Sequence, residues 1–134
     1  MMATYHLQIV TPDRMVFDGE AQSIILRTVN GDICILANHI DYAAPLGIGE
    51  AKVTTADGTE REGVCNGGLL SVENNTVRVI ATTFEWAEDI DVERAKRAQS
   101  LAEEQLRKLN REDADYALAE AKLKRAMARV QAGR

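Results

Sequence analysis

The residues best suited to chemistry lie near the C-terminal end of this sequence. Lys122, Arg125 and Arg129 follow one another at spacings of three and four residues, which places their side chains on one side of a helix. Two guanidinium forks one turn apart match the geometry of a polyphosphate. The same spacing is also typical of a solvated basic helix face, which Glu120 and the helix dipole would partly neutralise. Spacing alone leaves both alternatives open.

A second group of polar residues lies where the sequence pattern changes. Asp91 suits the N-cap of a helix, because its carboxylate would accept hydrogen bonds from free amides and face the positive end of the helix dipole. Ile90 and Ala95 then occupy the two positions of a hydrophobic staple. If two helices fold back on each other, Arg125 and Arg129 come close to Asp91, Arg94 and Glu85. The carboxylate could then take an adenine amino group while the arginines take phosphates.

The remaining reactive residue types are not arranged for catalysis or metal binding. Cys34, Cys65, His6 and His39 form no C-x-x-C and no His-x3-His pair, and both cysteines lie in apolar runs that are typical of small core residues. The sequence has no G-x-S-x-G motif, no glycine-rich phosphate loop and no catalytic pair of carboxylates. We therefore predict no metal site and no active site in this chain.

Composition and charge narrow the class of protein. The 134 residues are 46% hydrophobic and 28% charged, which is typical of a globular chain. The two cysteines are too few for a disulfide scaffold, so we expect a reducing, cytoplasmic setting. The net charge of -5 comes entirely from residues 1–84, with 5 basic and 10 acidic residues, since residues 85–134 have 11 of each. This distribution disfavours nucleic acid as a partner. We expect neither a signal peptide nor a membrane span, which would need about 18 apolar residues.

The first part of the chain is predicted to be an antiparallel β-sandwich or barrel, which we place at residues 1–84. Alternating apolar residues and regularly spaced turn signals support it. Asn30-Gly31 is the strongest hairpin signal, and we expect Pro45, Gly47 and Gly67-Gly68 to interrupt strands. The predicted strands are residues 5–10, 15–17, 21–29, 33–36, 52–55, 62–65, 69–72 and 77–81.

Residues 85–134 are predicted to form an antiparallel hairpin of two helices, each about five turns long. Apolar residues recur every three or four positions on both sides of a break at residues 110–113. Alanine dominates this seam and buries little apolar area, at about 25 cal/mol per Å². We therefore expect a weakly held hairpin that can change shape. The predicted seam residues are Ala95, Ala98, Ala102, Leu106, Leu109, Tyr116, Ala119, Leu123, Ala126 and Val130.

Three motifs occur in order along the chain: YHLQIVTPD at residues 5–13, NGDICILANH at 30–39 and NGGLLSV at 66–72. With the helical pair they cover essentially the whole sequence, which resembles the epsilon subunit of bacterial F-type ATP synthases. Ala37-Asn38 and Ser71 depart from the Pro-Gly and Glu that are common in that family. The resemblance implies an α+β fold, with an N-terminal β-sandwich followed by a C-terminal two-helix hairpin.

The resemblance also implies a function. Members of the family are non-catalytic subunits of the central stalk in a proton- or sodium-translocating enzyme. The subunit couples ring rotation to ATP synthesis, and its C-terminal helices inhibit ATP hydrolysis. The implied partners are the gamma subunit, the c-subunit ring and, when the helices extend, the catalytic beta subunit. The implied location is peripheral, on the cytoplasmic side of the bacterial plasma membrane. No cofactor is required, and ATP, with or without Mg²⁺, is the implied regulatory ligand.

Site residues follow from the same resemblance. The family's nucleotide motif, Ile/Leu-Asp-x-x-Arg-Ala, and its accompanying glutamate and arginine pair imply an ATP site of Glu85, Ile90, Asp91, Arg94, Ala95, Arg125 and Arg129. Asp32 and His39 are the implied contacts with the c-ring. Two hypotheses result: a regulatory subunit whose folded hairpin binds ATP, and a purely structural rotor adaptor that binds no nucleotide. An independent enzyme with a sandwich active site is strongly disfavoured.

Overall fold

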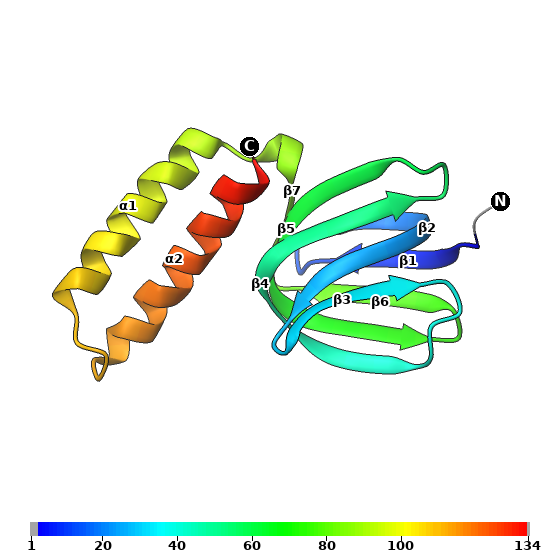
Figure 1. Cartoon of the computed structure of the whole chain (residues 1–134), viewed down its shortest axis with the longest axis horizontal. Helices are drawn as coiled ribbons and strands as arrows, with labels where there is room; N and C mark the ends of the chain where they lie inside the picture. Colours follow the sequence, from blue (N-terminus) through cyan, green and yellow to red (C-terminus); the bar gives the residue numbers. More distant parts are fainter. Residues whose placement is uncertain (1–2, 134) are drawn as a thin grey trace.

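The computed structural model describes residues 3–133 and has two parts, a β-sandwich and a helical hairpin beside it (Figure 1). This confirms the predicted fold class. The strands are β1 (Tyr5–Val10), β2 (Met15–Thr28), β3 (Gly31–Leu36), β4 (Tyr42–Thr55), β5 (Glu60–Glu73), β6 (Thr76–Ala81) and β7 (Phe84–Trp86). The 3-10 helix η1 (Ala87–Asp89), α1 (Val92–Lys108) and α2 (Ala114–Ala132) follow.

The strands form one sheet that folds over on itself. Its order is β1-β6-β5-β4-β2-β3, and β1 also pairs with β2, so the sheet closes into a flattened barrel. β1 and β6 are parallel, while the other pairs are antiparallel. The buried core lies inside the closure and contains, among others, Tyr5, Leu7, Ile24, Leu70 and Val79.

Three strands are longer than the sequence predicted. β2, β4 and β5 each have 14 residues and pass through the positions where we expected breaks. β2 pairs with β1 along its first half and with β3 along its second, and β5 pairs first with β7 and then with β6, while β4 stays paired with β5 throughout. Glycine in these strands therefore does not mark a strand end. Gly68 is the clearest case: its φ is +124°, and a Cβ there would lie 2.0 Å from the Ile80 carbonyl oxygen. β5 bends there, and β6 can pair closely with it.

The predicted hairpin is present, with its turn one residue earlier than Asn30-Gly31, and one core prediction is wrong. Val29 and Asn30 form a two-residue turn between the paired Thr28 and Gly31, which confirms the hairpin. Cys65 is buried as expected, and burial raises the pKa of its thiol to about 12. Cys34 is exposed, because it alternates outward with its neighbours on β3.

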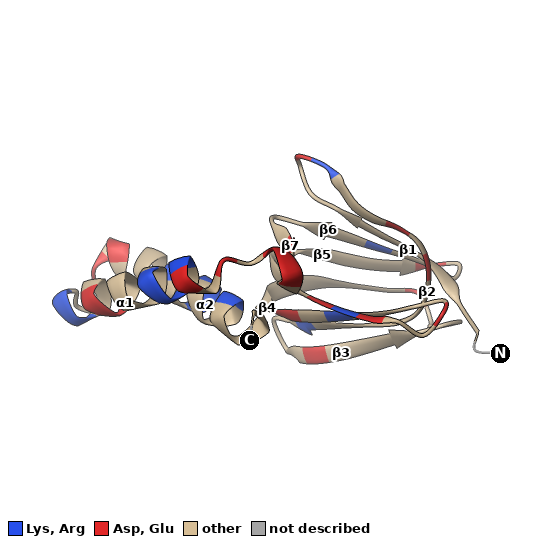
Figure 2. Cartoon of the chain, turned by 90° about the horizontal axis from the view of Figure 1, so that it is seen from above, with Lys and Arg blue, Asp and Glu red and all other residues tan. Residues whose placement is uncertain are grey.

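The two helices form the predicted antiparallel hairpin. α2 lies beside β4 and β5, and α1 lies on its far side (Figure 1). Ala95, Ala102, Ala119, Ala126 and Val130 are buried along the seam, whereas Ala98 lies exposed at its rim. Basic and acidic residues alternate over both helices (Figure 2). In the described part of the chain, neither helix is long and apolar enough to span a membrane.

β7 and η1 connect the two parts. Phe84 and Trp86 of β7 are buried in the sandwich core, and Glu85 between them faces outward. The boundary that we placed between residues 84 and 85 lies within this strand. The chain leaves the sandwich after Trp86 and enters α1 at Val92.

Candidate functional site

The start of α1 is built as the sequence predicted. Asp91 is the N-cap, and its Oδ1 accepts a hydrogen bond from the Arg94 backbone amide at 3.1 Å. Both residues are exposed. The carboxylate therefore stabilises the first turn of the helix and still faces solvent, where a ligand could reach it.

The end of α2 returns to this joint. A Cβ added at Gly133 would lie 2.5 Å from Val92 Cγ2 and 3.4 Å from Ile90 Cγ2. The hairpin therefore brings the last turn of α2 next to the first turn of α1, as antiparallel helices should. Ile90 is half-buried here, and Ala95 is buried one turn further along the seam.

One ion pair joins the hairpin to the sandwich at this point. Arg129 Nε donates to Glu85 Oε1 at 2.7 Å, and the two side chains are 31% and 34% exposed. They lie 44 residues apart in the sequence, so the contact depends on the folded hairpin. A partly screened pair of this kind contributes about 1 kcal/mol or less. It can hold the hairpin in place without locking it.

A groove between the helices carries the cationic residues. Lys122, Arg125 and Arg129 line a cavity of about 260 Å³ together with α1 residues. The three side chains therefore do leave one side of α2, as their spacing predicted. On the opposite wall, Ala98 and Ala102 were predicted as seam residues, whereas Leu101 and Gln105 were missed, although they follow Ala98 at spacings of three and four positions. That wall consists of Ala98, Leu101, Ala102 and Gln105.

The predicted ATP-site residues are only partly brought together. Glu85 contacts Arg129, and Arg129 shares the groove with Arg125. Asp91 and Arg94 lie at the joint end of the hairpin and are not among the residues that line the groove. The described arrangement is thus a cationic groove with an acidic partner at one end and a capped helix start nearby.

The two predicted ring contacts lie at opposite ends of β3. Asp32 is beside the β2–β3 turn, where it contacts Arg27. His39 is in the loop after β3, where its ring centroid lies 5.9 Å from that of Tyr42 and its Nδ1 is 2.7 Å from the Ile40 carbonyl oxygen. A six-residue strand is about 20 Å long. One narrow partner loop cannot contact both residues.

A row of exposed apolar residues crosses the outer face of the sandwich. Leu69 pairs with Pro45 on one side and Ile80 on the other, and Val10 pairs with both Ile80 and Met15. Leu69, Ile80 and Met15 are 53%, 48% and 50% exposed. We call these five residues the apolar row. A contiguous apolar strip of this kind is typical of a protein-binding surface.

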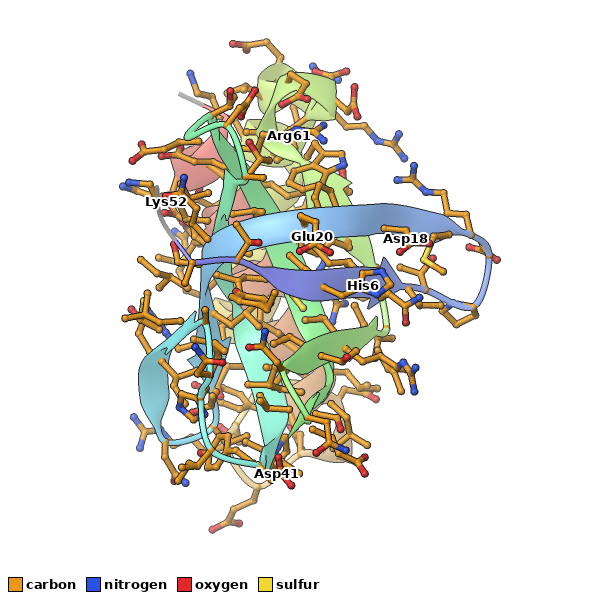
Figure 3. The ribbon with its side chains drawn as sticks, turned by 90° about the vertical axis from the view of Figure 1, so that its right-hand side faces the viewer. His6, Asp18, Glu20, Asp41, Lys52 and Arg61 are labelled. Carbon is orange, nitrogen blue, oxygen red and sulfur yellow. The ribbon has the colours of Figure 1, made fainter. Side chains whose placement is uncertain are left out.

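A polar contact lies on the side of the sandwich that faces away from the helices. There the side chains of His6 on β1 and Asp18 on β2 point toward each other and are in contact (Figure 3). Among the described residues, no group of three or more His, Cys, Asp or Glu side chains is placed to hold a metal ion.

Comparison with protein families gives two adjoining matches. The model described as the ATP synthase delta/epsilon chain β-sandwich domain matches residues 4–87. The model described as the ATP synthase delta/epsilon chain long α-helix domain matches residues 88–133. The two matches meet just after β7, where the sandwich ends.

Curated relatives extend over most of the chain. The sodium-ion-specific ATP synthase epsilon chain of Propionigenium modestum is 38% identical over 130 residues, which are 97% of this chain and 93% of the relative. The ATP synthase epsilon chain of Halalkalibacterium halodurans is 37% identical over 99% of this chain and 100% of the relative. That of Alkaliphilus oremlandii is 42% identical over 79% and 78%.

Two solved structures share the fold. A chain of the Euglena gracilis mitochondrial ATP synthase superposes with a TM-score of 0.83 at 22% identity, over 98% of this chain and 82% of that chain. A chain of the central stalk and c-ring structure of the Tetrahymena thermophila mitochondrial ATP synthase gives a TM-score of 0.67 at 16% identity, over 99% and 98%.

Proposed function

The chain belongs to the ATP synthase delta/epsilon family, and on this premise we propose that it is a regulatory subunit of the central stalk. It catalyses no reaction itself. Its sandwich joins the gamma subunit to the c-subunit ring, so that ring rotation is coupled to ATP synthesis. Its helices restrain ATP hydrolysis when they extend toward the catalytic beta subunit. It works peripheral to the membrane, on the cytoplasmic side.

The observation that carries this proposal is the loose attachment of the hairpin. Its seam is mostly alanine, and a cleft of about 1000 Å³ lies between α2 and strands β2 and β4. The ion pair of Glu85 and Arg129 is one of its few polar links to the sandwich. Elements with so little buried apolar contact open at low free-energy cost. The hairpin is therefore suited to leave the sandwich and to change shape.

ATP is the proposed ligand of the folded hairpin. Arg125, Arg129 and Lys122 supply cations in one groove, and the exposed Asp91 carboxylate lies near the end of that hairpin. ATP can favour the folded form only to the extent that it binds this form better than the extended one. Mg²⁺ can accompany the phosphates but is not required by the residues described.

Calorimetric titration of the full chain with ATP tests the nucleotide part. We expect saturable binding that is lost in Arg125→Ala and Arg129→Ala and retained in Lys108→Ala, a matched cation on the other helix. Hydrogen exchange of α1 and α2 should slow in the presence of ATP. If millimolar ATP gives neither heat nor protection, the ligand proposal fails, while the stalk function stands.

The alternative is a structural adaptor that binds no nucleotide. Glu85 already forms an ion pair with Arg129. Lys122 and Arg125, the other cations of the groove, could bind an acidic stretch of the beta subunit when the helices extend. Charge reversal at Arg125 and Arg129 separates the two functions. Relief of inhibition with unchanged ATP binding favours the adaptor.

The partner surfaces are proposed separately. The apolar row is suited to the gamma subunit because it is exposed, contiguous and uncharged. Asp32 and His39 are proposed ring contacts, but their separation along β3 means that each needs its own test. Cross-linking of Asp32→Cys and His39→Cys to the c-ring, one variant at a time, identifies which end of the sandwich meets the ring.

A further inference from the structure

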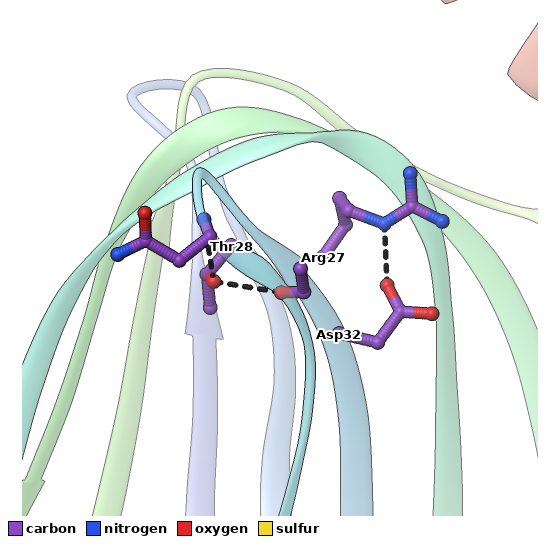
Figure 4. Close-up of polar contacts among 5 residues, drawn as sticks. Arg27, Thr28 and Asp32 are labelled. Atoms are coloured by element: carbon purple, nitrogen blue, oxygen red, sulfur yellow. Dashed lines mark hydrogen bonds and ion pairs between the residues drawn. The ribbon is translucent and has the colours of Figure 1, made fainter.

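The tip of the β2–β3 hairpin holds a charged pair. Arg27 and Asp32 are partners in the strand register, and Arg27 Nε donates a hydrogen bond to Asp32 Oδ1 (Figure 4). The two side chains are 50% and 56% exposed. Hydrogen bonding to Asp32 and its charge raise the pKa of Arg27, and Glu50 contributes further. An isolated surface pair would contribute little to stability, so its construction calls for another explanation.

The turn beneath this pair is fixed by one buried hydroxyl. Thr28 Oγ1 donates to the Gly31 carbonyl at 2.7 Å and accepts from the Asn30 amide at 3.1 Å (Figure 4). Thr28 is only 6% exposed. The two strand ends that carry Arg27 and Asp32 are thus held at a set spacing, which keeps the two side chains opposite each other.

The stem of Arg27 is seated on β4. A Cβ added at Gly49 would lie 2.7 Å from Arg27 Cβ and 3.1 Å from Arg27 Cγ, and one added at Gly47 would lie 3.5 Å from Arg27 Cγ. Only glycine at position 49 leaves space for the arginine in its observed place. The β2–β3 turn and strand β4 therefore both position the Arg27 side chain. An ion pair formed by chance on the surface would need neither.

The pair is open to a partner even when the hairpin is folded. Arg27, Val29 and Asp32 line one side of the cleft of about 1000 Å³, and Lys124 and Met127 of α2 line the other. Val29 is 61% exposed at the very tip. Within residues 3–133, Asp32 Oδ2 and the two terminal nitrogens of Arg27 make no hydrogen bond. A loop that enters here finds both an acceptor and donors.

We propose that Arg27 is a positioning residue for the ring contact at Asp32, and that the seated pair is recognised as one unit by a polar loop of the c-subunit ring. This inference rests on the ring contact proposed above. Because the pair of Arg27 and Asp32 has no net charge, it binds a partner mainly through short-range hydrogen bonds. Long-range electrostatic attraction contributes little. Recognition should therefore depend little on salt, whereas recognition of Asp32 alone by a cationic loop should depend on it strongly.

Binding of the full chain to the purified c-ring with gamma attached tests the proposal at low and high salt. Arg27→Ala, Asp32→Asn and Gly49→Ala should each weaken binding by about threefold to tenfold, the value of one or two hydrogen bonds, and by the same factor at both salt concentrations. Lys96→Ala, which removes a cation from a surface pair with Glu93 on α1, away from this cleft, should leave binding unchanged. Thermal unfolding confirms that each variant is folded.

The other outcomes separate the two proposals. If Asp32→Asn weakens binding while Arg27→Ala and Gly49→Ala do not, the ring contact stands and the positioning role is wrong. If Arg27→Ala strengthens binding at low salt, Asp32 alone meets a cationic loop, and the paired recognition is wrong. If Asp32→Asn changes nothing, the ring contact fails at this residue, and the inference fails with it.

Discussion

Arg129 takes part both in attaching the hairpin to the sandwich and in the proposed anion site. Its Nε bonds Glu85 of β7, and the same side chain lines the groove between the helices. An anion that takes Arg129 must compete with the Glu85 carboxylate or share the guanidinium with it. The affinity of the folded hairpin for an anion is therefore reduced by the existing contact between Arg129 and Glu85. Glu85→Gln keeps the size of the side chain but removes its charge, so it should change the affinity for the anion.

Asp91 and Arg94 allow capping and ligand binding to be separated. Asp91→Ala removes the helix cap, so it should lower the free energy of unfolding of the hairpin by about 1 kcal/mol and also weaken ATP binding. Arg94→Ala leaves the Arg94 backbone amide in place, so it should reduce ATP affinity with little effect on stability. Denaturant unfolding and calorimetric titration measure the two quantities. If both variants lose stability alone, this joint is a hinge without a binding role.

Local and distant contacts differ in how well the sequence predicted them. The Asp91 cap was predictable because it depends only on residues 91–94. The approach of Arg129 to Glu85 followed from antiparallel helices, which short loops enforce. The pairing of Arg27 with Asp32 was not predicted, because it depends on strand register and on the missing side chains at Gly47 and Gly49.

At the scale of elements, glycine was the main source of error. We expected Gly47, Gly67 and Gly68 to interrupt strands, but β4 continues through Gly47 with β5 as its partner, and β5 continues through Gly67 and Gly68 as its neighbour changes from β7 to β6. A single sequence shows that a residue is permissive, and it does not show whether the backbone turns or bends there. Helix bounds were more predictable, since periodicity extended over many residues.

The link between sandwich and hairpin is held by Arg61. Its guanidinium carbon lies 3.8 Å from the centroid of the Trp86 ring, and its Nη2 donates to Glu88 of η1 at 3.0 Å. Trp86 is buried against Phe84, with ring centroids 5.0 Å apart. Residues 86–88 are thus fixed to the sandwich, and we infer that the hairpin pivots within residues 89–91.

Arg61→Ala should loosen this link. Loss of the cation–π contact should lower the free energy of unfolding by about 1 kcal/mol. Loss of this contact together with the ion pair should speed hydrogen exchange at residues 87–91. Trp86 is the single tryptophan of the chain, so its fluorescence reports the change directly. Arg78→Ala, which removes an arginine bonded to Gln8 on another face, is the control. Unchanged exchange in Arg61→Ala would place the pivot elsewhere.

The same link should respond to acid. The hydrogen bond from Arg61 lowers the pKa of Glu88 below its usual value. A carboxyl group with a lowered pKa stabilises the fold above its unfolded pKa, and this contribution is lost as the pH falls through the folded value. Acidification below the ordinary glutamate range should therefore change Trp86 fluorescence in the wild type. Glu88→Gln should abolish this step, and persistence of the step in that variant would assign it to another group.

At the scale of the whole molecule, stability and movement belong to different parts. The main hydrophobic core lies entirely between Tyr5 and Trp86, while the hairpin buries mostly alanine and docks across a cleft. The sandwich can therefore remain folded and attached to its partners while the hairpin changes position. This division was predictable from the change of hydrophobic period near residue 90. The size of the cleft was not, because it depends on how α2 settles on β4 and β5.

The apolar row provides a test of how the sandwich is fixed within a larger assembly. Leu69→Glu places a charge within the row, between Pro45 and Ile80. The side chain there is already 53% exposed, so the free energy of unfolding should change by about 0.5 kcal/mol or less. Binding to the gamma subunit should fall more than tenfold, because a desolvated charge would lie in the interface. Ser71→Glu adds the same charge two residues along the same strand, outside the row, and should bind nearly normally. If both variants bind equally well, the row is not the gamma surface, and the sandwich must attach through another face.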